Sequence, residues 1–186
     1  MLQLLKNNFF LFFILISSFE AYSEEDPYSF IDKNAQEMVE ILTNESYLFE
    51  FDRSLYEQKI KDIFEPMIDF RRVAASVMGK KYYLMATKDE RSQFVEIFKD
   101  SLLDTYAETL AQWGDSTITT KFPLEEHELV KNVEVKQILD TGTSTYPISY
   151  KLRKSEDGWK IINIIINGVN LGLTFRNQFQ ALALTN

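Results

Sequence analysis

The sequence predicts an α+β domain in which a helical first half is followed by a strand-rich second half. Apolar residues recur at helical spacing from residue 26 to about residue 113, and the period then changes to that of extended strands. No Pro- or Gly-rich linker separates the halves, and 186 residues suit one domain. We therefore expect a single domain over residues 24–186.

Residues 1–23 have the features of a secretory signal peptide. Lys6 gives a positive start, Phe9 to Ile16 form an apolar run, and Ala21 and Ser23 flank a cleavage point. The run is shorter than the roughly 20 apolar residues of a membrane anchor. The sequence contains no Cys, so it offers neither a disulfide nor the acylated Cys of a bacterial lipoprotein. We expect an exported protein without stable membrane insertion.

Two helices are expected before residue 81. The first spans residues 26–45, and one stripe of it carries Ile31, Ala35, Met38 and Leu42. The second begins near Pro66 and ends before Gly79, since Pro favours helix starts and Gly favours helix ends. Its apolar face carries Phe70, Val73, Ala74 and Val77.

A long third helix is expected to start at a capping box and to end near Trp113. Thr87 and Glu90 have the spacing at which each side chain can accept the other's backbone N–H. Large apolar residues then follow at four-residue intervals: Phe94, Phe98, Leu102 and Tyr106.

Four strands are expected after Gly114, within residues 116–122, 129–139, 145–153 and 158–168, joined as a meander. The third alternates apolar and polar residues, which indicates one solvated face. The fourth is apolar on both faces, with Trp159, Ile161 and Ile165 on one and Ile162, Ile164 and Ile166 on the other. We expect this strand to lie centrally in the sheet, and an amphipathic helix to begin around Asn170.

Composition and motifs exclude several functions. A formal charge of −8 argues against a nucleic-acid partner and against strong adhesion to anionic membranes. His127 stands among three glutamates, but adjacent charges rarely converge on one ion, so we interpret this segment as a solvated turn. No nucleophile elbow, phosphate loop or dinucleotide fingerprint occurs. We therefore expect no enzyme activity, metal or cofactor.

Three segments resemble the MlaC family, also called the toluene-tolerance auxiliary family. They are "MGKKYYLMAT", the helix that carries "TYAETL", and the tail with "IINGVNL" and "FRNQF". The resemblance covers about residues 26–183. It implies an NTF2-like fold in which helices pack on a curved, mainly antiparallel four-stranded sheet that encloses an apolar pocket.

The resemblance also implies a function, a location and partners. Members are periplasmic phospholipid carriers of Gram-negative bacteria, with phospholipid as cargo and no cofactor. They shuttle lipid between an outer-membrane lipoprotein–porin complex and an inner-membrane ABC transporter complex, which maintains outer-membrane lipid asymmetry. A soluble monomer is expected.

This role accounts for the excess of apolar residues near the end of the chain. Exposing two long acyl chains to water costs roughly 20 kcal/mol, at about 0.8 kcal/mol per methylene. A carrier therefore needs apolar side chains arranged around a space, although ordinary core packing is the alternative for each residue. The expected tail contacts are Val73, Val77, Phe98, Leu102, Tyr106, Ile148, Tyr150, Ile164, Ile166, Val169, Leu171 and Phe175.

Three alternatives remain open at this point. The first is an NTF2-like enzyme for a small hydrophobic substrate, in which Asp69, Tyr106 or Tyr150 would be the buried acid or base. The second is a carrier of another membrane lipid, such as a hopanoid. The third is an envelope interaction module with a filled core.

Overall fold

The computed structural model describes residues 25–111, 116–124 and 130–184, with the backbone alone for residues 106–111. The proposed signal peptide, the segment around His127 and the side chain of Tyr106 lie outside the described residues. Within the described ranges, no helix has the length and apolar character needed to cross a membrane.

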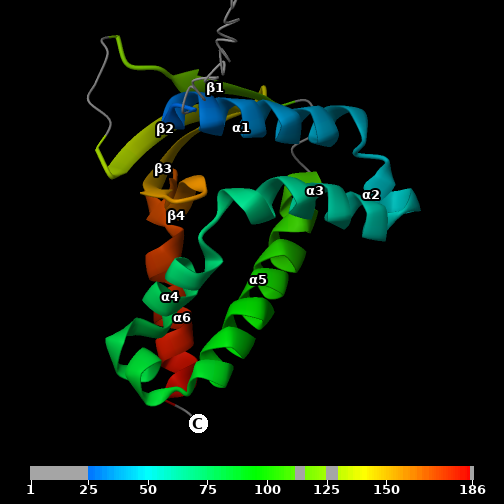
Figure 1. Cartoon of the computed structure of the whole chain (residues 1–186). Helices are drawn as coiled ribbons and strands as arrows, with labels where there is room; N and C mark the ends of the chain where they lie inside the picture. The colour runs from blue at the N-terminus through cyan, green and yellow to red at the C-terminus, as the bar shows by residue number, and fades with distance from the viewer. Residues whose placement is uncertain (1–24, 112–115, 125–129, 185–186) are drawn as a thin grey trace, which may run out of the picture.

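The structure confirms the α+β class (Figure 1). The helices are α1 (Pro27–Asn44), α2 (Leu48–Phe51), α3 (Arg53–Met67), α4 (Phe70–Met85), α5 (Lys88–Ala111) and α6 (Leu171–Ala183). The strands are β1 (Thr117–Lys121), β2 (Asn132–Asp140), β3 (Thr145–Ser155), β4 (Gly158–Ile166) and β5 (Val169–Asn170). Helix α1 runs along the sheet, whereas α4, α5 and α6 extend away from it and their far ends come together at the opposite end of the molecule (Figure 1).

Helix α1 forms as the sequence predicts. The Asp26 carboxylate caps it by accepting hydrogen bonds from the backbone N–H groups of Tyr28 (2.9 Å) and Ser29 (3.1 Å). Three residues of the predicted stripe, Ile31, Met38 and Leu42, are buried. They join side chains of α3 and of one sheet face in the main hydrophobic core.

The expected start of the second helix near Pro66 is wrong, whereas its expected end before Gly79 is confirmed. Pro66 lies in the last turn of α3, and Ile68 is extended and forms a parallel bridge with Ile161 of β4. Helix α4 starts only after Asp69, whose carboxylate accepts the Arg72 N–H (2.9 Å). Gly79, with φ 69°, has a non-helical backbone, so the helical segment that begins at Phe70 ends there and a second segment of α4 follows across a kink. A capping aspartate therefore sets the helix start, and the glycine produces a kink.

The capping box at the start of α5 is confirmed. The Thr87 N–H donates to Glu90 Oε2 (2.7 Å), and the Glu90 N–H donates to Thr87 Oγ1 (3.2 Å). Hydrogen bonds donated by the Thr87 N–H and by the Thr87 hydroxyl hold the pKa of the Glu90 carboxyl below its ordinary value.

The sheet has five antiparallel strands in the order β1-β2-β3-β4-β5, not the four expected. The additional strand β5 follows a tight turn at Asn167 (φ 49°) and Gly168 (φ 81°), a pair of left-handed residues that suits a hairpin. The central position expected for β4 is wrong. Strand β4 pairs with β3 along its length, but on its other side only Ile165 and Ile166 pair with β5.

An irregularity between β3 and β4 decides which isoleucines face the helices. The register shifts between Lys151 and Leu152, as in a β-bulge, and this reverses the alternation along the rest of β4. Ile164 consequently lies opposite Tyr150 on the helix-covered face, whereas Ile165 lies opposite Ser149 on the other face. The predicted grouping of the β4 side chains is therefore wrong beyond the bulge.

Candidate functional site

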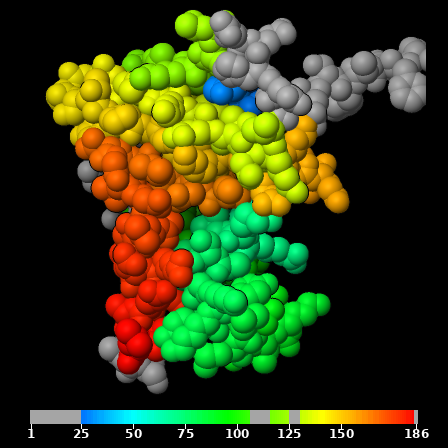
Figure 2. Space-filling view, turned by 90° about the vertical axis from the view of Figure 1, so that its left-hand side faces the viewer, coloured from blue at the N-terminus to red at the C-terminus, as the bar shows by residue number. Residues whose placement is uncertain are grey.

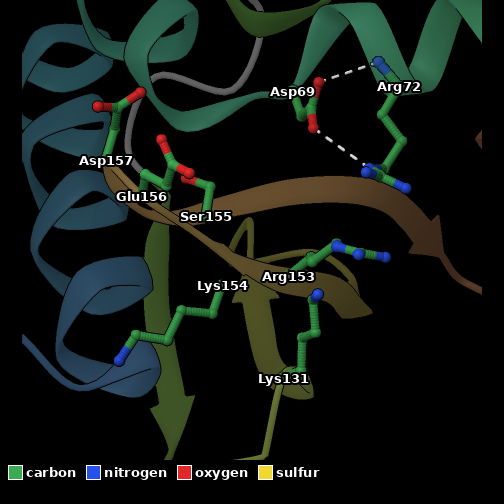
Figure 3. A pocket seen from close by; sticks show the side chains of 8 residues that line it. All are labelled: Asp69, Arg72, Lys131, Arg153, Lys154, Ser155, Glu156 and Asp157. Carbon is green, nitrogen blue, oxygen red and sulfur yellow. Dashed lines mark hydrogen bonds and ion pairs between the residues drawn. The ribbon is translucent and has the colours of Figure 1, made fainter.

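A charged surface cleft of about 480 Å³ opens in the described part of the chain (Figure 3). We call it the polar cleft, and it is lined by Asp69, Arg72, Lys131, Arg153, Lys154, Ser155, Glu156 and Asp157. Among the side chains drawn, a salt bridge joins Asp69 to Arg72 (3.3 Å), while the others spread around the opening (Figure 3). Charges of both signs and an open mouth do not favour an apolar ligand.

A second space, of about 150 Å³, lies between the inner face of the sheet and helices α3, α4, α5 and α6. This apolar cavity is lined by Ile60, Phe64, Ile68, Val73, Leu102, Leu103, Ile148, Tyr150, Ile161, Asn163, Ile164, Ile166, Leu171, Gly172 and Phe175. No lining residue carries a charge, and only Tyr150 and Asn163 have polar side-chain atoms. The cavity suits a ligand with aliphatic chains.

Asn163, the polar residue inside the isoleucine run, attaches α6 to the cavity wall. Its Oδ1 accepts the Gly172 N–H (3.1 Å), and its Nδ2 donates to Asn170 Oδ1 (3.1 Å). The same Asn170 oxygen accepts the Leu173 N–H (3.0 Å) and so caps α6. The first turn of α6 is thereby held against β4.

Gly172 is required for this close approach, which gives a first testable prediction. A Cβ at residue 172 would stand 2.6 Å from Asn163 Oδ1. We expect Gly172→Ala to reduce the free energy of unfolding by about 1 to 3 kcal/mol, because the packed wall must shift. A thermal or denaturant scan measures the loss. The same substitution in an Asn163→Ala background should be less damaging, and an equal loss in both backgrounds would contradict the proposed clash.

A smaller space of about 70 Å³ lies beneath α1 and shares Phe64, Ile148 and Tyr150 with the apolar cavity. Tyr150 is 9% exposed, and burial raises the pKa of its hydroxyl well above the ordinary value. The hydroxyl is therefore protonated at neutral pH and can donate a hydrogen bond, but it is not a base.

The acid–base candidates of the enzyme alternative do not assemble in this cavity. Asp69 lines the polar cleft and caps α4, Tyr150 is held protonated, and the Tyr106 side chain lies outside the described residues. Within the described ranges, no group of three or more His, Cys, Asp or Glu residues could hold a metal ion.

Eight of the twelve expected contact residues line the apolar cavity: Val73, Leu102, Ile148, Tyr150, Ile164, Ile166, Leu171 and Phe175. Val77 is buried in α4 (2% exposed) without reaching the cavity, and Phe98 lies just outside it, edge-on to Phe175. Val169 is 53% exposed, so the expectation that it lines the pocket is wrong. Val169 pairs with Ile166 beside the tight turn at residues 167 and 168.

Several lining residues were not expected from the sequence. Ile60 and Phe64 belong to α3, a helix that was not assigned. Its buried residues Tyr56, Ile60, Ile63 and Met67 follow helical spacing, which could have revealed both the helix and its buried face.

A row of aromatic rings in consecutive contact extends away from the cavity between α5 and α6, and we call it the aromatic row. Its ring centroids are 5.6 Å apart for Phe175–Phe98, 5.9 Å for Phe98–Phe94, 5.2 Å for Phe94–Phe179 and 5.4 Å for Phe179–Tyr82. The aromatic row extends from the cavity wall toward the ends of α5 and α6 that lie farthest from the sheet (Figure 1).

The fold and the uncharged cavity define an α+β protein of the class that encloses an apolar ligand site. The chain belongs to the MlaC family, whose model, described as MlaC protein, matches residues 32–185. This finding confirms the resemblance seen in the sequence.

Two relatives of known description support the same assignment. The toluene tolerance protein ttg2D of Pseudomonas putida is 26% identical over 168 residues, which cover 89% of this chain and 78% of that protein. A phospholipid-binding protein from Ralstonia solanacearum, solved in complex with a phospholipid, matches with a TM-score of 0.75 and 25% identity. That match covers 84% of this chain and 87% of the solved one.

Proposed function

We propose that this protein is a periplasmic lipid carrier that holds the acyl chains of a phospholipid in the apolar cavity and releases them unchanged. The observation that carries the proposal is a cavity whose fifteen lining residues include no charged side chain. Membership of the MlaC family and the likeness to a phospholipid-binding protein support it.

Binding a phospholipid requires the cavity walls to move apart. The apolar cavity measures about 150 Å³, whereas sites for small molecules commonly enclose about 300 to 1,000 Å³. Helix α6 has no buried residue, although three of the other helices (α1, α3 and α4) and the sheet have several. Because displacement of α6 would expose no fully buried residue of that helix, we expect α6 to be the wall that moves.

The acyl chains and the headgroup would meet different surroundings. The chains require an apolar wall, because each methylene left in water costs about 0.8 kcal/mol. Since the lining carries no ion-pairing group, the charged headgroup is expected to stay in solvent. The carrier should accordingly discriminate weakly among headgroups.

Within the envelope, the proposed carrier would receive phospholipid from one membrane complex of the Mla system and deliver it to another. The outer-membrane lipoprotein–porin complex and the inner-membrane ABC transporter complex are the proposed partners, and membrane lipid asymmetry is the proposed benefit. Export through the segment at residues 1–23 would place the chain between these complexes.

Extraction of the purified protein with organic solvent, followed by mass spectrometry, tests the proposal. We expect about one phospholipid, or its equivalent in acyl chains, per protein. A hopanoid in place of phospholipid would identify another cargo. Protein that carries no lipid after purification from a phospholipid-rich host would contradict the carrier function.

A further inference from the structure

The far ends of α4 and α6 and the start of α5 form a compact tip opposite the sheet (Figure 1 and Figure 2). We define the tip as residues 80–91 and 182–184. The Tyr82 hydroxyl donates to the Ala183 carbonyl (3.5 Å), which joins α4 to α6. The Arg91 guanidinium donates to the Ala86 carbonyl (2.8 and 3.1 Å), which joins α5 to the end of α4.

Large apolar side chains are exposed on this tip. The exposed fractions are 65% for Leu84 and 71% for Met85, and Tyr83 is 36% exposed. Leu182 and Leu184 of the adjoining segment are 66% and 76% exposed. Single exposed apolar residues are ordinary, but a group of five on neighbouring segments marks an interaction surface.

The charge of the tip is opposite to that of the whole chain. Residues 80–91 contain four cations, Lys80, Lys81, Lys88 and Arg91, against two carboxylates. One of these, Glu90, already accepts the hydrogen bonds of the capping box. In a chain with a formal charge of −8, this local excess of positive charge favours an anionic partner.

Two of the cations lie over aromatic faces beside the apolar residues. Lys81 Nζ stands 4.9 Å from the Tyr82 ring centroid, and the Arg91 guanidinium stands 4.3 Å from that of Tyr83. Tyr, Leu and Met interleaved with Lys and Arg are typical of segments that lie at a membrane–water interface. Long basic side chains can there reach lipid phosphates while their stems cover apolar surface.

We propose that the tip binds reversibly to the surface of an anionic phospholipid bilayer. Leu84 and Met85 enter the boundary between headgroups and acyl chains, and Lys80 and Lys81 contact the phosphates. The contact is confined to the surface, and the acidic remainder of the protein opposes tighter adhesion. This role is additional to lipid carriage and does not require the cavity to hold lipid.

The aromatic row extends from the tip to the cavity. At the tip end of the aromatic row, the Tyr82 ring lies 5.4 Å from the Phe179 ring, measured between centroids. At the other end, Phe175 lines the cavity. Between these two ends, Phe98, Phe94 and Phe179 contact one another in turn. A bilayer bound at the tip would therefore face the outer end of the aromatic row that extends to the cavity.

Vesicle flotation with the full mature chain tests the proposal. We expect binding to vesicles that contain phosphatidylglycerol, weaker binding to pure phosphatidylcholine vesicles, and a loss of binding as salt increases. We expect each of two double variants to lower the partition coefficient at least about tenfold: Lys80→Glu with Lys81→Glu, and Leu84→Gln with Met85→Gln. The first removes two electrostatic contacts with lipid phosphates, and the second removes two apolar side chains from the bilayer boundary.

Matched substitutions at the sheet end provide the controls. Lys131→Glu with Arg153→Glu reverses two charges in the polar cleft (Figure 3), and Leu124→Gln removes another exposed leucine. These variants should bind vesicles like the unmodified chain. Equal losses in the controls and the tip variants would overturn the proposal, because they would indicate a general charge effect.

Two further results would overturn the proposal. One is the absence of flotation with phosphatidylglycerol vesicles. The other is a dimer that analytical ultracentrifugation detects and that the tip substitutions dissociate, in a protein that does not bind vesicles. The tip would then bind a second copy of the chain instead of a bilayer. The tip variants should retain as much lipid as the unmodified chain, so failure here is distinguishable from failure of the carrier function.

Discussion

Replacement of Ile164 by glutamate is expected to abolish the retention of phospholipid by the folded protein. Ile164 lines the apolar cavity and lies opposite Tyr150 on the inner face of the sheet. The cavity offers no cation to pair with a new carboxylate, and an unpaired charge is strongly disfavoured in an apolar site. Lipid per protein, measured by mass spectrometry after solvent extraction, should fall to background.

The neighbouring residue supplies the matched control. Ile165 has the same side chain on the same strand, but it lies opposite Ser149 on the other face of the sheet. That face is polar, with Lys151 bound to Glu134 (2.6 Å). Ile165→Glu should therefore keep its lipid, and so should Val169→Glu, because Val169 is exposed.

A folding check separates loss of binding from loss of structure. Far-ultraviolet circular dichroism and a thermal scan should show cooperative unfolding for each variant. If Ile164→Glu does not fold, Phe175→Glu tests the same cavity from α6, which contributes no buried residue to the core. A normal lipid content in both folded variants would rule out this cavity as the acyl-chain site.

Regular periodicity in the sequence was enough to predict most of the secondary structure. The stripe on α1, the capping box of α5 and the alternation of Ile148, Tyr150 and Leu152 on β3 are all confirmed. These elements follow one repeat without interruption, so the pattern of residues determines which side chains are buried.

The predictions failed where a local irregularity or a tertiary contact overrides the pattern. The bulge between β3 and β4 reverses the faces of the isoleucine strand, and nothing in the apolar run of β4 marks its position. The break before α4 depends on the bridge between Ile68 and Ile161, which lie far apart in the sequence. The turn before β5 was not predicted, although the Asn167–Gly168 pair is a residue pair typical of such hairpins.

The size of the cavity could not be predicted from residue types. Apolar composition indicates which side chains form walls, but the distance between walls depends on how α6 sits on β4. That distance is set by the contact of Asn163 with the Gly172 backbone. The same residue types around a more tightly closed α6 would give an ordinary filled core.

Removal of bound lipid is expected to lower the melting temperature, because an open apolar cavity is unfavourable. The cavity of about 150 Å³ corresponds to about 4 kcal/mol at roughly 24 cal/mol per Å³. Widened to about 500 Å³ without a ligand, it would cost about 12 kcal/mol, which rivals the roughly 5 to 15 kcal/mol stability of a typical domain. The walls can therefore separate only when a ligand fills the space.

Loading should accordingly stabilise the folded chain, since the ligand binds only that state. At a free lipid concentration about 100 to 1,000 times the dissociation constant, binding raises the free energy of unfolding by roughly 3 to 4 kcal/mol. A shift of roughly 2 to 4 °C per kcal/mol for a chain of this size gives an expected rise of about 10 °C. Thermal scans of delipidated protein and of the same sample reloaded with phospholipid measure the rise. Short water-soluble esters serve as the control, because they bury too few methylenes to produce it. Superimposable melting curves for the stripped and reloaded samples would contradict the carrier function and would favour a protein-interaction module with a filled core.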